Sequence, residues 1–154
     1  MKIIWVMLVL IFSSSCHKSK DENLLNGEWK YVRSFKIYQS FHCYECPGFD
    51  YDSAIYHFLL KNNHEFTGRI NRIECGGTVH IESKEKGKEV SSGDFHITEF
   101  TIYNKPIVTK EDTDFIDLFE RVTQYYRIHH ADTDVYRFLE LYSGEDILLF
   151  AQKK

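Results

Sequence analysis

The segment GEWKYVRSFKIY, residues 27–38, alternates between apolar and polar side chains. Aromatic and β-branched residues at every second position are typical of a strand with one buried face. Trp29, Tyr31 and Phe35 share one face of the predicted strand. Arg33 falls on the same face and interrupts the pattern. The period of two nevertheless predicts that this face lies against a core.

Similar patterns predict seven further strands. Asn62-Asn63 indicates a tight hairpin, because asparagine tolerates left-handed backbone angles, and Ser143-Gly144 indicates another turn. The apolar phase shifts at Thr98-Glu99, which predicts a β-bulge. The predicted strands are 27–38, 54–61, 64–70, 76–83, 93–103, 121–129, 135–142 and 146–152.

Two segments interrupt this series. Residues 84–92 are charged, small and contain a glycine, so we expect an exposed loop there. Apolar residues near 115–122 repeat at i, i+3, i+4 and i+7, which is helical spacing. We expect a short helix near 113–120, capped by Asp112 or Thr113. About eight strands joined mostly by short turns indicate an all-β fold, an antiparallel barrel or sandwich, and not βαβ units.

The first sixteen residues have the order of parts of a bacterial lipoprotein leader. Met1-Lys2 is followed by an apolar run over 3–12, three serines and Cys16. Ten helical residues rise about 15 Å, too little to cross a hydrocarbon core of about 30 Å, so the run fits a secretory signal. We expect residues 1–15 to be a signal peptide, 16–24 to be a lipidated Cys16 with a tether, and 25–154 to be one domain. A plain secreted protein cut near Cys16 is the alternative.

The leader also predicts a location. A triacylated Cys16 would be a stable anchor, because two or more acyl chains hold a protein to a membrane. Lys20-Asp21-Glu22 resembles signals that send some lipoproteins to the outer face of the outer membrane, and the alternative is a solvated linker. We expect a cell-envelope protein anchored in the outer membrane of a bacterium, with surface exposure as one outcome.

Composition and motifs exclude several classes of function. The formal net charge is −4 and no Lys/Arg run is present, so we expect no nucleic-acid partner. The chain has no Gly-x-Ser-x-Gly elbow, phosphate loop or His-Glu-x-x-His motif, and we expect no enzyme and no cofactor.

Three cysteines follow Cys16. Export favours disulfide formation, and Cys43, Cys46 and Cys75 allow one bridge, for which we favour Cys75 joined to Cys43 or Cys46. Cysteine and histidine at 42–46 also suit zinc, but a second ligand pair is absent, so we expect no metal. The Cys-x-x-Cys pair lacks the βαβ setting of a redox site.

Leu25-x-Gly27-x-Trp29 on a first strand, after a lipoprotein leader, resembles the lipocalin-like domains of small bacterial lipoproteins. The resemblance covers most of residues 24–152 and implies an up-and-down barrel, with Trp29 packed across one end. It also implies a basic residue stacked on that tryptophan, which the sequence does not assign. The lipocalin Thr-Asp-Tyr motif occurs only loosely, at 133–136 and near the chain end.

Two functions are compatible with this barrel. In one, the protein binds a small apolar molecule inside the barrel, close to a membrane. In the other, the barrel is filled, and loops 39–53 and 84–94 contact a protein of the envelope. The aromatic residues that we expect to line the barrel interior, as a ligand pocket or as core, are Trp29, Tyr31, Phe35, Phe58, Phe66, Tyr126 and Phe138.

Overall fold

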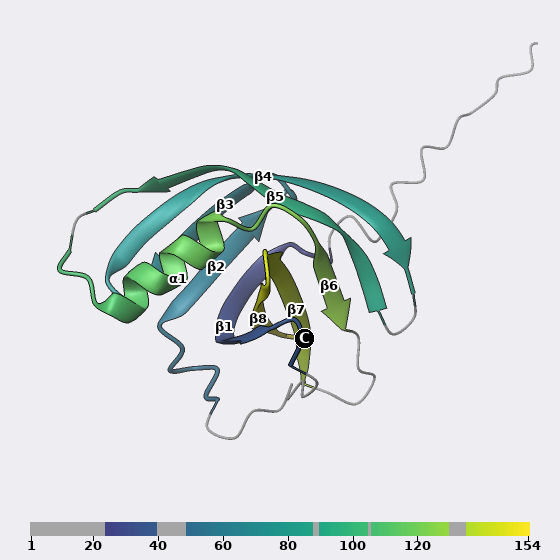
Figure 1. Cartoon of the computed structure of the whole chain (residues 1–154), viewed down its shortest axis with the longest axis horizontal. Helices are drawn as coiled ribbons and strands as arrows, with labels where there is room; N and C mark the ends of the chain where they lie inside the picture. Colours follow the sequence, from purple (N-terminus) through teal and green to yellow (C-terminus); the bar gives the residue numbers. More distant parts are fainter. Residues whose placement is uncertain (1–23, 40–48, 88–89, 105, 130–134) are drawn as a thin grey trace, which may run out of the picture.

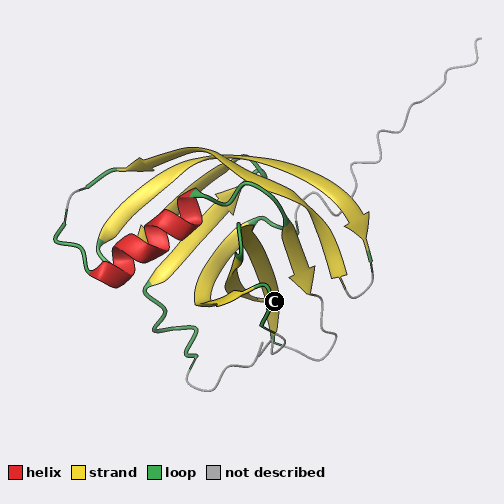
Figure 2. Cartoon of the chain, in the orientation of Figure 1, coloured by secondary structure: helices red, strands yellow, loops and turns green. Residues whose placement is uncertain are grey.

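The chain forms a closed antiparallel barrel with one helix. The computed structural model describes residues 24–39, 49–87, 90–104, 106–129 and 135–154. Eight strands pair in sequence order, and the last strand pairs with the first. Figures 1 and 2 show the sheet curving around α1, which lies under the arch of β2–β5. The elements are β1 Gly27–Lys36, β2 Tyr56–Lys61, β3 Glu65–Ile70, β4 Ile73–Lys86, β5 Val90–Ile102, α1 Lys110–Glu120, β6 Tyr126–His129, β7 Tyr136–Ser143 and β8 Asp146–Lys153.

This topology confirms the all-β prediction and selects the barrel. Turn residues account for its tight connections. Asn62 and Asn63 have φ angles of 53° and 51°, and Gly144 has a φ of 63°. Positive φ values at these positions give two-residue turns the twist that antiparallel strands require. The hairpin predicted from Asn62-Asn63 is therefore confirmed.

The β4–β5 hairpin is longer than the sequence predicted. We expected a loop over 84–92, but β4 continues to Lys86 and β5 begins at Val90. Charged residues on this arm are exposed while Ser91 and Ser92 are buried, so both faces look polar in sequence. The bulge predicted at Thr98-Glu99 is confirmed, since Thr78 pairs with Glu99 while Val79 pairs with Ile97.

A second bulge reverses the faces of β1. Tyr31 pairs with Phe150, whereas Arg33 pairs with Leu149, so Val32 is an extra residue in this ladder. A single inserted residue moves everything after it to the opposite face of the sheet. Phe35 therefore lies outside the barrel, and its predicted interior position is wrong.

The core consists of two clusters on opposite faces of the sheet. The inner cluster fills the barrel and includes Trp29, Phe58, Leu148 and Phe150. The outer cluster covers the outside of β1, β7 and β8 and is shielded by the segment that contains Phe49 and Tyr51. Its buried members are Phe35, Tyr51, Phe138, Ile147, Leu149 and Ala151. Phe138 thus also lies outside the barrel, contrary to the prediction.

Helix α1 begins earlier than predicted. Thr109 is its N-cap: the Thr109 hydroxyl accepts a hydrogen bond from the Asp112 amide, and the Asp112 carboxylate accepts one from the Thr109 amide. This reciprocal pair is a capping box, and Thr-x-x-Asp is its sequence signal. Asp112 and Thr113 are therefore inside the helix, and neither is its N-cap.

The register defines two ends of the barrel. The N-terminal end contains the start of β1, the turn at 61–64, the tip of the β4–β5 hairpin and the C-terminus. The helix end contains the end of β1, the turn at 70–73, α1 and the turn at 143–146. A ligand could therefore enter the barrel from either of two ends, which are lined by different elements.

Candidate ligand-binding site

At the helix end, the barrel is filled by aromatic side chains. Phe115 and Phe119 of α1 enter the inner cluster and are 6% and 2% exposed. The Phe119 ring lies 5.4 Å from the ring of Phe58 and 5.7 Å from that of Phe66, and the Phe115 ring lies 4.7 Å from that of Tyr31. Contacts at these distances leave no room for a guest, so this half of the barrel is core.

A polar network closes the N-terminal end around Trp29. The Trp29 indole is fully buried and its Nε1–H donates to the Leu25 carbonyl at 2.6 Å. The Arg137 guanidinium lies 5.9 Å from the Trp29 ring and donates to the Gln152 side chain. Gln152 in turn donates to the Asn26 carbonyl at 3.2 Å. Burial lowers the pKa of Arg137, but an arginine remains charged at neutral pH.

Arg137 occupies the position beside Trp29 that the resemblance implied for a basic residue and that the sequence did not assign. It lies on β7, in phase with the buried Leu139 and Leu141. The sequence signal for this residue is an arginine two positions before Leu139 and four before Leu141, which places it on the same inward face. Its Nε is buried and has no hydrogen-bond partner, and the guanidinium lies over the Trp29 ring, an arrangement that favours a cation.

A cavity of about 330 Å³ lies beside this plug, at the N-terminal end. Its walls come from the segment before β1, the β2–β3 turn, the β4–β5 arm and β6. The lining combines leucine and isoleucine side chains with amide, hydroxyl and ammonium groups. The lining residues are Leu24, Leu25, Asn62, Asn63, Ile81, Ser83, Lys86, Ser91, Tyr126 and Ile128.

Electrostatics distinguish this cavity from the aromatic core. Lys86 is the one charged residue among those that line it. Burial raises the pKa of the Tyr126 hydroxyl, and its hydrogen bond to Ser83 and the nearby charge of Lys86 act in the opposite direction. Tyr126 is therefore neutral at physiological pH. The site offers neutral donors, one cation and apolar side chains.

A second hollow of about 690 Å³ lies at the helix end, between β1 and the segment before β2. It is more open than the first, and residues 40–48, which precede its lining segment, are outside the described part of the chain. Tyr31, Arg33, Phe49 and Tyr56 contribute to its wall. An open groove next to an undescribed segment is the weaker candidate for a small-molecule site.

The structure separates the seven aromatic residues that the sequence grouped. Trp29, Phe58 and Phe66 are buried in the inner cluster and pack as core. Tyr126 lines the cavity and Tyr31 lines the open groove. Phe35 and Phe138 are in the outer cluster. The sequence does not predict Lys86 and Ser91 as residues of the cavity, because the composition of 84–92 indicates a loop.

Cys75 is a free cysteine, 2% exposed, and burial raises its pKa to about 11. The bridge that we favoured from Cys75 to Cys43 or Cys46 is therefore not formed in the structure. Cys43 and Cys46 lie outside the described residues, as does Cys16.

The described part of the chain lacks two further kinds of feature. There, no three His, Cys, Asp or Glu side chains gather as metal ligands. No helix in that part has the length and apolar character needed to cross a membrane.

Comparisons with protein-family models, curated proteins and solved structures find no match to this chain. The closed eight-stranded antiparallel barrel with one helix is compatible with a lipocalin-like fold.

Proposed function

We propose that this protein is a lipid-anchored envelope protein of lipocalin-like type that binds a small amphipathic molecule in the cavity at the N-terminal end. The observation that carries the proposal is the cavity of about 330 Å³, whose lining combines apolar side chains with a few polar groups. Pockets of about 300–1,000 Å³ with a few convergent polar groups are typical of small-molecule sites.

The position of the cavity supports a role beside the membrane. The cavity wall includes Leu24, and eight chain steps separate Leu24 from Cys16. Eight fully extended residues reach at most about 30 Å, roughly one hydrocarbon thickness. An acylated Cys16 would therefore hold this end of the barrel close to the bilayer surface, where amphipathic molecules are concentrated.

The chemistry of the lining supports an amphipathic ligand. Leu25, Ile81 and Ile128 offer apolar contact, and burial of such contact stabilises binding by about 25 cal/mol per Å². Lys86 and Ser91 offer donors to an oxygen-rich head group.

Fluorescence titration of the mature chain with cis-parinaric acid, a fluorescent fatty acid, tests the proposal. Ser83→Trp places a large side chain in the cavity, whereas Glu82→Trp places the same side chain on the adjacent outward position. We expect saturable binding that weakens at least tenfold in Ser83→Trp and changes less than twofold in Glu82→Trp. Absence of saturable binding by the unmutated chain would exclude this function.

A second candidate function follows from the opposite end of the barrel. Large apolar side chains are exposed there on several connections, among them Tyr38, Ile55 and Tyr103, and Ile107 is 96% exposed. Exposed apolar side chains that lie close together can form a protein-binding surface. A photo-crosslinker at Ile107 that captures one defined envelope protein, while the same group at Glu74 does not, would favour this function.

A further inference from the structure

Two exposed histidines face each other across the β4–β5 ladder. His80 on β4 is the direct partner of His96 on β5. On either side of the pair the register is regular, because Val79 pairs with Ile97 and Ile81 pairs with Phe95. The next bulges lie beyond these pairs, so the two histidines are fixed opposite each other by regular sheet.

The alternation of the sheet points both imidazoles outward. Val79, Phe95 and Ile97 are buried in the inner cluster, and Ile81 packs against it. Neighbouring strand residues lie on opposite faces, so His80 and His96 lie on the outer face, where both are exposed. This face is on the other side of the sheet from the proposed ligand cavity.

From this geometry we propose a surface site for a divalent transition metal, chelated by the His80 and His96 imidazoles. Directly opposed residues of an antiparallel pair have Cβ atoms about 4.5–5.5 Å apart. Two nitrogens at a Zn–N distance of about 2.0–2.1 Å are about 3.3 Å apart in a tetrahedral site. Two imidazoles reach that separation by rotating their side-chain torsions, with no change in the backbone.

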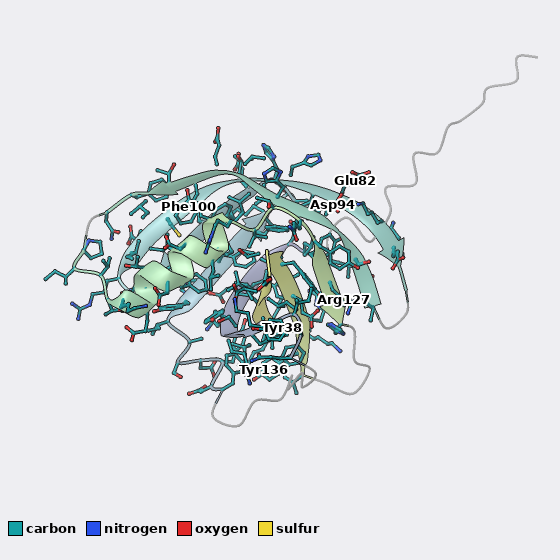
Figure 3. All side chains as sticks on the ribbon, in the orientation of Figure 1. Tyr38, Glu82, Asp94, Phe100, Arg127 and Tyr136 are labelled. Atoms are coloured by element: carbon teal, nitrogen blue, oxygen red, sulfur yellow. The ribbon has the colours of Figure 1, made fainter. Side chains whose placement is uncertain are left out.

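Neighbouring groups on the outer face make the site favourable for a cation. Glu82 pairs with Asp94 at the next outward position, and Figure 3 marks both on this part of the β4–β5 ladder. The Lys84 ammonium forms an ion pair with the Asp94 carboxylate at 2.7 Å, which offsets one of these two negative charges. On the other side, the Thr78 and Thr98 hydroxyls bond to each other at 2.7 Å.

Among the described residues, no third His, Cys, Asp or Glu side chain groups with His80 and His96 as a metal ligand. The metal would therefore keep water in its remaining positions, and the site would prefer ions that favour imidazole, which are Zn²⁺, Ni²⁺ and Cu²⁺, over Mg²⁺ and Ca²⁺. Two ligands predict moderate affinity and rapid exchange, which suits capture or delivery of an ion.

Calorimetric titration of the untagged mature chain with Zn²⁺ tests the proposal. His80→Ala and His96→Ala are each expected to weaken the binding at least tenfold, and the double variant is expected to abolish it. His64→Ala is the matched control, because His64 is exposed on the neighbouring hairpin and outside the pair. Unchanged Zn²⁺ affinity in both single variants would overturn the proposal.

A second readout locates the metal. In NMR spectra, one equivalent of Zn²⁺ should shift the imidazole signals of His80 and His96 and leave that of His64 in place. The same titration of a Cys43→Ser/Cys46→Ser variant should give the same shifts, because the proposed ligands are imidazoles only. Loss of the shifts in that variant would assign the metal to the cysteines and overturn the proposal.

Discussion

Truncation of Phe119 to alanine tests the inference that α1 is part of the barrel core. Phe119 is 2% exposed and its ring contacts aromatic rings from β2, β3, β5 and β8. Buried Phe→Ala substitutions cost about 3–5 kcal/mol, and the cost is largest where the surrounding groups cannot collapse into the space. Because these neighbours sit on four different strands of a closed sheet, we expect the upper half of that range.

Equilibrium urea unfolding of the mature chain, followed by tryptophan fluorescence, measures this loss. We expect a fall in the free energy of unfolding of about 4 kcal/mol, or roughly 10–20 °C in Tm for a domain of this size. The control is Asp117→Ala, an exposed position of the same helix, for which we expect a change within about 0.5 kcal/mol.

The comparison of the two variants separates core packing from helix propensity. Alanine favours helix, so neither variant weakens α1 by propensity alone. A loss below about 1.5 kcal/mol in Phe119→Ala would refute the inference, because it would mean that α1 rests on the barrel without filling it. In that case the helix end would be open to a ligand.

Three further predictions concern the cap, the buried thiol and the bulge. Burial opposes ionisation of Asp112, but hydrogen bonds from the Thr109 amide and hydroxyl and from Tyr56 outweigh it and hold the Asp112 pKa below its usual value of 3.8. A lowered folded-state pKa stabilises the protein above pH 4, and this stabilisation is lost as the pH falls through that pKa. Asp112→Asn should therefore lower the thermal stability at pH 7 and reduce the further loss of stability between pH 4 and pH 2. An unchanged pH profile of thermal unfolding would contradict this. Cys75, with its pKa raised to about 11, should resist iodoacetamide at pH 8 in the folded protein and react in urea, as peptide mass spectrometry will show; rapid labelling of the folded chain would count against its burial. In Gly77→Ala the added Cβ would meet the Glu99 backbone carbonyl at the β5 bulge, so we expect the free energy of unfolding in urea to fall by about 2 kcal/mol or more. The exposed control Thr67→Ala should change it little. Equal stability of the two variants would show that the bulge can move.

Much of the fold follows from local pattern. The period of two in β2 and β3, the Asn62-Asn63 turn and the bulge at Thr98 are all visible in sequence, because side-chain alternation and turn angles depend on neighbouring residues. The helix near 113–120 was found from its apolar spacing. Its true start at Thr109 was readable as a capping box and was missed.

The candidate sites depended on information that local pattern does not contain. The bulge at Val32 exists only because β1 pairs with β8, residues about 120 positions later in the chain, and it moves Phe35 to the outer cluster. The end of β4 and the start of β5 are sheet because they pair with each other, and the start of β5 also pairs with β6; this pairing places Lys86 and Ser91 at the cavity.

The amino-acid sequence alone determined the number and order of the strands and the presence of the helix, and it predicts export, since each of these is read from short runs of residues. Only the tertiary structure decided that the aromatic interior is filled, that Arg137 stacks on Trp29, that a cavity remains at the N-terminal end and that His80 opposes His96. The physical reason is register: a shift of one residue in pairing exchanges the faces of a strand, and register is set by contacts between segments far apart in the chain.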